Sequence, residues 1–312
     1  MMKKGKSLVL GLMTISCLAQ SVPAFATSVD KGKDNTYKVE KNFSNEIDTY
    51  GRKVIKVTNE NMSYIQLGDI KSEKSIVIMH GSAMNANVMI PYGECYADAG
   101  YNVVLVDLPG HYTGVGTSKD EFKELGDRVS KLMDKLVKQG VLNEKSEVQG
   151  WSLGGSVALD LAIRHPKHIS AVGIIDSASN FNGLDLGSVT DENRLASLAG
   201  AVSMLKSTIV SQDVTDRIIA ELPIISASTE AINNDYAIDK VLNIDNSLGK
   251  IKVPVYDFFG GADMLTTLDK QNEMLSKIKN GQLYVGENYN HFAVVENPEY
   301  VFNAFEEMRN AN

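Results

Sequence analysis

Cysteine is scarce in this 312-residue sequence, which contains Cys17 and Cys95 alone. Cys17 lies in a segment that we expect to be removed, so Cys95 would be the one cysteine of the mature chain and no intramolecular disulfide could form. A chain of about 285 residues can do without one, because it buries roughly three-quarters of its unfolded surface on folding. Cys95 lies in an amphipathic helical pattern, where cysteine is usually a small buried hydrophobe. We therefore expect a fold that depends on its apolar core.

Histidine is also scarce, with five residues, and the sequence shows no Cys/His cluster, internal repeat or low-complexity tract. It accordingly predicts neither a metal site nor a cofactor. The formal net charge is −8, with acidic and basic residues interspersed. This balance argues against nucleic acid or an anionic membrane as the main partner. A small molecule is the partner that we expect.

The first 26 residues have the pattern of an export signal. Three lysines precede an apolar stretch at 8–19, and residues 24–26 read Ala-Phe-Ala, which is typical of a cleavage site. The apolar stretch has about a dozen residues, fewer than the roughly 20 that a membrane-spanning helix needs. Cys17 has no leucine three residues before it, which disfavours a lipid-attached mature N-terminus. We expect cleavage near Thr27 and a soluble secreted protein without a stable membrane anchor.

Strand-like and helical patterns alternate along most of the mature chain, which predicts an α/β fold with a mostly parallel sheet and helices on both faces. We expect eight strands, of which the first two form an antiparallel pair and the next two are buried on both faces. The predicted strands are residues 52–57, 62–67, 75–79, 102–107, 146–149, 171–176, 253–259 and 282–285. The predicted helices of this core are residues 87–99, 121–139, 155–164, 268–279 and 298–309.

The alternation breaks between residues 181 and 250. Helical stretches at 192–206 and 214–221 occur there without a convincing buried strand, so we expect a helical cap inserted after the sixth strand. Residues 27–180 and 251–312 would form the core. The side chains of the cap would pack on the core, line a pocket or face solvent. The apolar candidates for a pocket are Leu195, Leu198, Val202, Met204, Leu205 and Ile209, and the polar ones are Asp191, Glu192, Arg194, Asp213, Asp216, Arg217, Glu221 and Glu230.

Residues 150–154 read Gly-Trp-Ser-Leu-Gly, a G-x-S-x-G pentapeptide between a predicted strand and a predicted helix. This context is typical of a nucleophile elbow, which places the serine on a sharp turn. Glycine suits the positions two residues to either side, because neighbouring elements come so close there that side chains would clash. A chance match is the alternative. The pattern predicts Ser152 as a nucleophile if the other reacting groups are present.

Acyl transfer by serine needs a base, a group that orients the base, and donors for the oxyanion. His291, between the last strand and the last helix, is the expected base. His80 and His111 are alternative candidates for the base, because they are also histidines. We expect His165 and His168, at the end of the helix that follows Ser152, to lie on the surface.

Asp263 follows the carboxyl end of the seventh strand, at the edge where open α/β sheets bind ligands. It is the expected orienting acid, although an Asp just before a helix can also be an N-cap. Asp176, at the end of the sixth strand, is a second candidate. The sharp turn after the third strand offers a backbone N–H of Ser82, or alternatively of Ala83, that would converge with the N–H of Leu153 on the oxyanion.

Taken together, these segments resemble the α/β-hydrolase superfamily over roughly residues 52–308. The order Ser, Asp, His is also the order of that family. The resemblance implies that Ser152 is the nucleophile, His291 the general base and then acid, and Asp263 its orienting residue, with Ser82 and Leu153 as oxyanion donors. The matching motifs are His80-Gly81, Asp107-Leu108-Pro109-Gly110-His111, the pentapeptide, Gly261-Ala262-Asp263, and His291-Phe292 with Glu296-Asn297-Pro298-Glu299.

The sequence departs from the family pattern at two places. Asn290 stands directly before His291, where many members have glycine, and residues 112–118 form a longer turn than the usual glycine-rich one after Pro-Gly-His. Neither departure removes a reacting group. Both bear on the rim of the expected pocket.

The resemblance implies a metal-independent serine hydrolase that cleaves a small or medium-sized carboxylic ester through an acyl-enzyme, and the export signal adds the expectation that it is secreted. An aminopeptidase or amidase, a lactonase, a C–C hydrolase or a cofactor-free haloperoxidase-like enzyme would use the same residues. A non-catalytic binding module on a hydrolase scaffold is a further alternative. Because the base must be neutral to accept a proton, we expect activity to fall as His291 protonates on the acidic side of neutrality.

Overall fold

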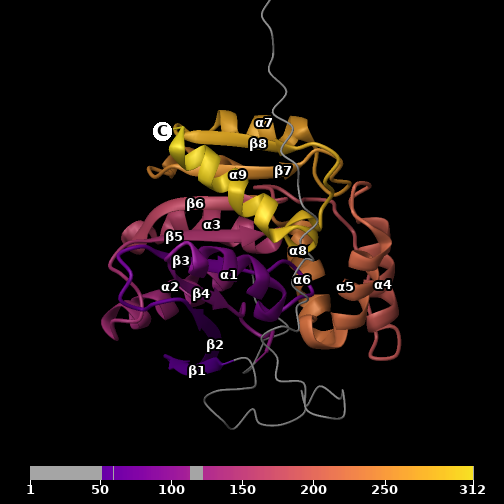
Figure 1. Ribbon diagram of the computed structural model, residues 1–312, viewed down its shortest axis with the longest axis horizontal. Coiled ribbons are helices and arrows are strands. Elements are labelled where there is room, and N and C mark those ends of the chain that lie inside the picture. Colours follow the sequence, from indigo (N-terminus) through magenta and orange to yellow (C-terminus); the bar gives the residue numbers. More distant parts are fainter. Residues whose placement is uncertain (1–50, 59, 113–121, 312) are drawn as a thin grey trace, which may run out of the picture. The chain divides into compact units, whose positions relative to one another are not determined.

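The computed structural model describes residues 51–58, 60–112 and 122–311 (Figure 1). The expected export signal and most of the turn at 112–118 lie outside the described residues. The strands are β1 (Arg52–Val57), β2 (Glu60–Leu67), β3 (Ser75–Met79), β4 (Asn102–Val106), β5 (Ser146–Trp151), β6 (Ile169–Ile175), β7 (Val255–Gly260) and β8 (Gly281–Gly286). The α-helices are α1 (Ile90–Asp98), α2 (Phe122–Lys138), α3 (Leu153–Arg164), α4 (Arg194–Met204), α5 (Gln212–Ile225), α6 (Thr229–Val241), α7 (Leu268–Ser276), α8 (Ala293–Glu296) and α9 (Pro298–Asn310), with short 3-10 helices η1 (Ala86–Met89), η2 (Pro166–His168) and η3 (Asp245–Lys250).

The eight strands form one sheet in the order β1-β2-β4-β3-β5-β6-β7-β8. Strand β2 is antiparallel to both β1 and β4, and every other neighbouring pair is parallel. This arrangement confirms the predicted α/β fold. Since parallel strands end at one edge of a sheet, the loops after β3, β5, β6, β7 and β8 meet there.

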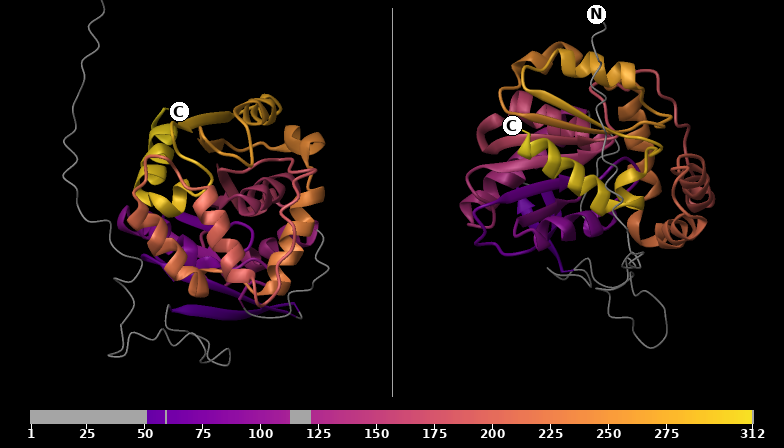
Figure 2. Two further views of the ribbon diagram at one scale, coloured as in Figure 1. Left: turned by 90° about the vertical axis from the view of Figure 1, so that its right-hand side faces the viewer. Right: turned by 45° about the horizontal axis from the view of Figure 1, so that its top comes forward.

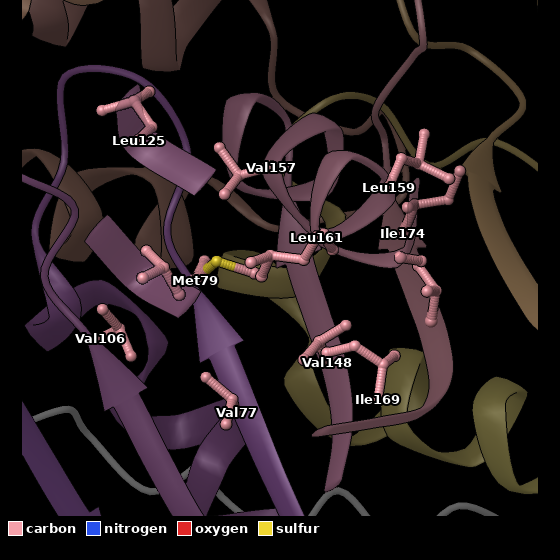
Figure 3. Close-up of a cluster of buried hydrophobic side chains, with 14 of the residues drawn as sticks. Val77, Met79, Val106, Leu125, Val148, Val157, Leu159, Leu161, Ile169 and Ile174 are labelled. Carbon is pink, nitrogen blue, oxygen red and sulfur yellow. The ribbon is translucent and has the colours of Figure 1, made fainter. Parts of the chain in front are cut away.

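Helices cover both faces of the sheet, which explains why β3 and β4 are buried along their whole length. Helices α1 and α9 pack together on one face and α2 and α3 on the other (Figures 1 and 2). Successive side chains of a strand point to opposite faces. Val77 and Val148 accordingly pack in one apolar cluster with Val157 and Leu161 of α3 (Figure 3). Strands β3 and β4 are mainly apolar on both faces because each contributes to two such layers, whereas β5 has the buried polar residues Glu147 and Gln149 alternating with Val148.

Between β6 and β7 the chain forms α4, α5 and α6, and we call residues 181–250 the insertion. In the left view of Figure 2 this part of the chain faces the viewer. The predicted helices at 192–206 and 214–221 correspond to α4 and α5, whereas α6 was not predicted. The buried face of α6 carries Asp235 and Asp239 beside Ile232 and Ile238, so the apolar periodicity that identifies a helix is broken.

Two smaller expectations can be compared with the structure. His168 was expected at the surface, and this prediction is wrong: the ring is buried, with Nδ1 2.8 Å from the Glu144 carbonyl and Nε2 2.9 Å from Asp134. The Cys95 thiol donates a hydrogen bond to the Pro91 carbonyl within α1, and burial raises its pKa to about 11. A thiol that stays protonated suits the structural role expected for Cys95. None of the described helices has both the length and the apolar composition needed to cross a membrane.

Candidate active site

Ser152 lies on the turn between β5 and α3, in the backbone conformation φ 53°, ψ −123°. A residue other than glycine held at positive φ costs about 1–3 kcal/mol, which the surrounding structure must offset. The Ser152 N–H donates to the carbonyl of Ile175 at 2.9 Å, and the Ser177 hydroxyl donates to the carbonyl of Ser152 at 2.6 Å. Hydrogen bonds from β6 and the residues after it therefore hold the turn on both sides of the serine.

The two glycines of the pentapeptide allow the close approach that the sequence predicted. A Cβ on Gly150 would overlap the backbone of Gly154, and a Cβ on Gly154 would lie 2.5 Å from the carbonyl oxygen of His80. Real Cβ atoms do not approach backbone atoms so closely. The turn can form at this position because neither residue has a side chain.

Three side chains from three loops meet at the carboxyl edge of the sheet. The Ser152 Oγ lies 3.1 Å from Nε2 of His291, and Nδ1 of His291 lies 2.9 Å from Oδ2 of Asp263. Both Ser152 and His291 are buried, with exposed fractions of 8% and 4%. The structure thus brings together the three residues named from the sequence, at distances that suit a nucleophile, its base and an orienting group.

The environment of Asp263 favours an ionised carboxylate. Burial alone would raise its pKa, but the His291 ring and the N–H groups of Leu265 and Thr266 lower it below the ordinary value. The ionised carboxylate accepts a hydrogen bond from Nδ1–H of His291, and this leaves Nε2 as an acceptor for the Ser152 hydroxyl. The N-cap of α7 is Thr267, so Asp263 is not the cap of that helix.

Asp176, the second candidate acid, interacts electrostatically with Asp263, but Asp263 is the carboxylate that contacts His291. The Asp176 Oδ1 accepts a hydrogen bond from the N–H of Gly260 at 2.6 Å, at the end of β7. Burial, reinforced by the negative charge of Asp263, raises the pKa of Asp176 well above the ordinary value. Its contact supports the strand from which the loop of Asp263 departs.

The two competing histidines have other partners. The His80 Nδ1–H donates to the Gly81 carbonyl, and its Nε2 accepts from the N–H of Leu108 at 3.0 Å. Burial and the neighbouring His111 lower the pKa of His80 well below the ordinary value, in line with a neutral ring. His111 contacts Asp235 of α6 through Nε2 at 2.8 Å. These bonds are consistent with structural roles for both rings.

Asn290 and Trp151 fix the loop that carries His291. The Asn290 Oδ1 accepts from the N–H of His291 at 2.8 Å and from the N–H of Met264 at 3.2 Å, and the Trp151 indole donates to the His291 carbonyl at 2.7 Å. Where the family pattern has glycine, this chain therefore has a side chain that joins the loops after β7 and β8. The sequence marked Asn290 as a departure but did not indicate this contact.

The turn after β3 passes beside the nucleophile. A Cβ on Gly81 would lie 3.1 Å from the Ser152 Cβ. The N–H of Ala83 donates to Asp235 Oδ2 at 2.8 Å, so the alternative oxyanion donor is already engaged. Ser82 remains as the candidate on this turn. Leu153 is the first residue of α3, and the N–H groups of a helix's first turn have no intrahelical partner.

A small pocket of about 70 Å³ opens on Ser152 and His291. The expected pocket residues Leu198 and Leu205 line it, whereas Leu195, Met204 and Ile209 are exposed. None of the eight polar insertion residues named from the sequence lines it, and the carboxylate that does so is Asp239 of the unpredicted helix α6. The lining residues are Ser82, Ala83, Met84, Trp151, Ser152, Phe181, Leu184, Leu186, Leu198, Ala201, Leu205, Tyr236, Asp239, Leu265, His291 and Phe292.

A mostly parallel sheet whose central strand leads into a serine on a tight turn, with histidine and aspartate following in chain order, is the architecture of the α/β-hydrolases. The protein is an enzyme of this class. Residues 70–298 match the model of the family described as serine aminopeptidase, S33, and the chain belongs to that family. Across the described residues, no group of three or more His, Cys, Asp or Glu side chains could hold a metal ion.

Several kinds of hydrolase are similar to this chain at low identity. It is 25% identical over 242 residues to a pimeloyl-[acyl-carrier protein] methyl ester esterase of Neisseria meningitidis serogroup A, covering 72% of this chain and 73% of the relative. It is 24% identical over 254 residues to a 2-hydroxy-6-oxononadienedioate/2-hydroxy-6-oxononatrienedioate hydrolase of Comamonas testosteroni, covering 75% and 87%. The solved structure of a 2-hydroxy-6-oxo-6-phenylhexa-2,4-dienoate hydrolase from Rhodococcus sp. strain RHA1 superposes with a TM-score of 0.69 at 19% identity, covering 83% and 98%.

Proposed function

We propose that the protein hydrolyses a small or medium-sized carboxylic ester through an acyl-enzyme intermediate on Ser152. The observation that carries this proposal is the chain of contacts from Ser152 Oγ to His291 Nε2 and from His291 Nδ1 to Asp263 Oδ2, at 3.1 and 2.9 Å. Each of the three groups has the partner that its role in acyl transfer requires.

In this mechanism the Ser152 Oγ attacks the ester carbonyl while His291 Nε2 takes its proton. The negative charge on the carbonyl oxygen is stabilised by the N–H groups of Ser82 and Leu153. The tetrahedral intermediate collapses, and the alcohol leaves with the proton held by His291. Water then attacks the acyl-enzyme with His291 as base, which releases the acid and restores Ser152.

The pocket supports a short acyl group. Its walls are mainly apolar and its volume is about 70 Å³, so a long chain would have to extend out of it. The relative from N. meningitidis is a methyl ester esterase, which also supports an ester as the cleaved bond. We expect p-nitrophenyl acetate and butyrate to be hydrolysed with a higher kcat/KM than the palmitate ester.

A test compares wild type with Ser152→Ala on this ester series. Loss of at least about 10³-fold in kcat in the variant supports the proposal, because the nucleophile provides most of the chemistry. Ser156→Ala is a matched control, since Ser156 is a buried serine of α3 whose hydroxyl donates to the Ala178 carbonyl. Ester turnover that survives Ser152→Ala would exclude the mechanism.

An aminopeptidase is the second candidate function. It is favoured by a carboxylate oxygen at the pocket that has no hydrogen-bond partner among the described residues. Asp239 lines the pocket, and its Oδ1 accepts no hydrogen bond from the described residues. A carboxylate oxygen in that position would suit a substrate amine. Activity on aminoacyl p-nitroanilides with a free amine, lost on the N-acetylated analogues, would support this candidate over the esterase. Equal activity on both would exclude it.

We also propose that the protein is exported and that cleavage near Thr27 releases it. The basic start, the apolar stretch at 8–19 and the Ala-Phe-Ala at 24–26 support this proposal. N-terminal sequencing of the protein recovered from culture medium tests it. Recovery with an intact N-terminus, from cells alone, would contradict it.

A further inference from the structure

The turn that carries Ser82 has an unfavourable backbone conformation at its next residue. Ala83 has φ 68°, a value that residues other than glycine rarely adopt, and the turn is closed by a 3.3 Å hydrogen bond from the N–H of Met84 to the carbonyl of Gly81. Backbone of this kind persists where surrounding contacts hold it. The direction of the Ser82 N–H therefore depends on what holds the turn.

Two carboxylates of α6 hold the turn from the side of the insertion. The Ala83 N–H donates to Asp235 Oδ2 at 2.8 Å, and the Ser82 hydroxyl donates to Asp239 Oδ2 at 2.6 Å. Asp235 and Asp239 are four residues apart, so they lie on one face of α6. Both are buried, with exposed fractions of 0% and 3%.

The end of α5 and the residues after it make two further backbone contacts, one with the same turn and one with Asn85, which follows it. The N–H of Ala227 donates to the carbonyl of Ala83, and the N–H of Asn85 donates to the carbonyl of Ile225, each at 2.8 Å. These four hydrogen bonds join the turn and Asn85 to the insertion, and the Asn85 side-chain amide donates two more, to the carbonyls of Ile224 and Ser226. The geometry of the turn is a joint property of the core and the insertion.

Asp235 is itself anchored to the core by His111. Nε2 of His111 lies 2.8 Å from Asp235 Oδ2, while Nδ1 lies 3.1 Å from the carbonyl of Leu108. Burial alone would lower the pKa of His111, but the Asp235 carboxylate raises it above the ordinary value. A protonated ring can donate to both partners at once. The loop after β4, α6 and the turn of Ser82 are therefore joined through one carboxylate.

We propose that Asp235 and Asp239 are positioning residues that hold the Ser82 N–H in place for the oxyanion, so that the oxyanion site is complete when the insertion is docked on the core. The proposal rests on the esterase function proposed above. The two carboxylates act through Ala83 and the Ser82 hydroxyl rather than through the reacting atoms.

The Ser82–Asp239 contact gives the sharpest test. Ser82→Ala keeps the backbone N–H and removes the hydroxyl, and Asp239→Leu removes the carboxylate. With p-nitrophenyl acetate, which has no amine to bind Asp239, each variant should lower kcat by about tenfold, a part of the 10²–10³ that loss of an oxyanion donor costs. KM should stay within about twofold, because ground-state binding is unaffected. The double variant should be no worse than either single variant, since both break one contact.

Two comparisons separate positioning from a general loss of structure. Asp239→Asn keeps an acceptor for the Ser82 hydroxyl and should restore kcat to within about threefold of wild type. Glu230→Leu makes a similar change at an exposed site of α6 and should leave kcat unchanged. The Ki of an alkyl boronic acid, which forms a tetrahedral adduct on serine, should rise in parallel with the fall in kcat/KM.

Unchanged kcat and boronic acid affinity in folded Ser82→Ala would overturn the proposal, and so would fully additive effects in the double variant. Thermal melting establishes that each variant is folded, and Ser82→Ala decides alone if Asp239→Leu does not fold. If wild type lacks ester turnover but reacts with a fluorophosphonate, the proposed ester substrate fails, and the labelling rates of the same variants test the positioning role. If wild type does neither, both proposals fail.

Discussion

Asn290 accepts a hydrogen bond from the backbone N–H of Met264 through Oδ1, at 3.2 Å. Because Asn290 precedes the candidate base and Met264 follows the candidate acid, this contact ties together the loops that place His291 and Asp263. The same oxygen accepts from the N–H of His291 at 2.8 Å. A glycine at this position could provide neither bond.

Replacing Asn290 with glycine should loosen the alignment of His291 with Asp263. We expect kcat for p-nitrophenyl acetate to fall by about three- to tenfold, since small misplacements of a catalytic group reduce the rate strongly. Asn290→Asp keeps Oδ1 and is the matched control, which should retain more activity than the glycine variant. Equal kcat values in wild type and Asn290→Gly would contradict the alignment role.

Asp263→Asn should reduce kcat far more, by about 10³- to 10⁴-fold, because an amide no longer stabilises the tautomer and the charge of His291. Asp176→Asn is the control. It keeps an acceptor for the Gly260 N–H and should leave kcat within about fivefold of wild type. Steady-state kinetics on one ester measure both variants. A larger loss in Asp176→Asn than in Asp263→Asn would reverse the assignment of the acid.

Asp239 should make stability depend on pH. Burial, assisted by Asp235 and opposed by the Ser82 hydroxyl, raises its pKa to about 7, against about 3.9 in an unfolded chain. Between these values the native state binds more protons than the unfolded state, so its free energy of unfolding decreases as the pH rises from about 4 to about 7. Asparagine does not titrate, so Asp239→Asn should be free of this decrease.

Melting temperatures at pH 5 and pH 8 measure this effect. The melting temperature of Asp239→Asn minus that of wild type should be a few degrees larger at pH 8 than at pH 5. Glu221, whose pKa burial raises to about 7, titrates in both proteins and cancels in the difference. A difference that does not change with pH would show that Asp239 has an ordinary pKa in the folded chain.

The central site could be predicted from sequence because its signals are local. Gly150 and Gly154 are required by one tight turn, Asp263 follows the buried and mainly apolar strand β7, and His291 follows the short strand β8. Parallel strands then bring these loops to one edge without further information. The sequence could not show whether Asp263 caps a helix or faces His291, since both roles place an aspartate in the same loop.

The contacts made by α6 could not be predicted, for a physical reason. Asp235 and Asp239 occupy positions that face the protein interior, where helical periodicity expects apolar residues. Their partners, Ala83, Ser82 and His111, lie more than a hundred residues away in the chain. Spacing along the sequence indicates neighbours on one helix, but it does not indicate which distant hydroxyl or N–H will meet a buried carboxylate.

The most direct test of the proposed mechanism is to detect the covalent adduct. Wild type incubated with a fluorophosphonate, or quenched within milliseconds after mixing with p-nitrophenyl butyrate, would be analysed by intact mass and by peptide mapping. The mechanism predicts one added phosphonyl or butyryl group, located on Ser152 and missing in Ser152→Ala. Ester turnover with no adduct on Ser152, or an adduct that persists in Ser152→Ala, would contradict it.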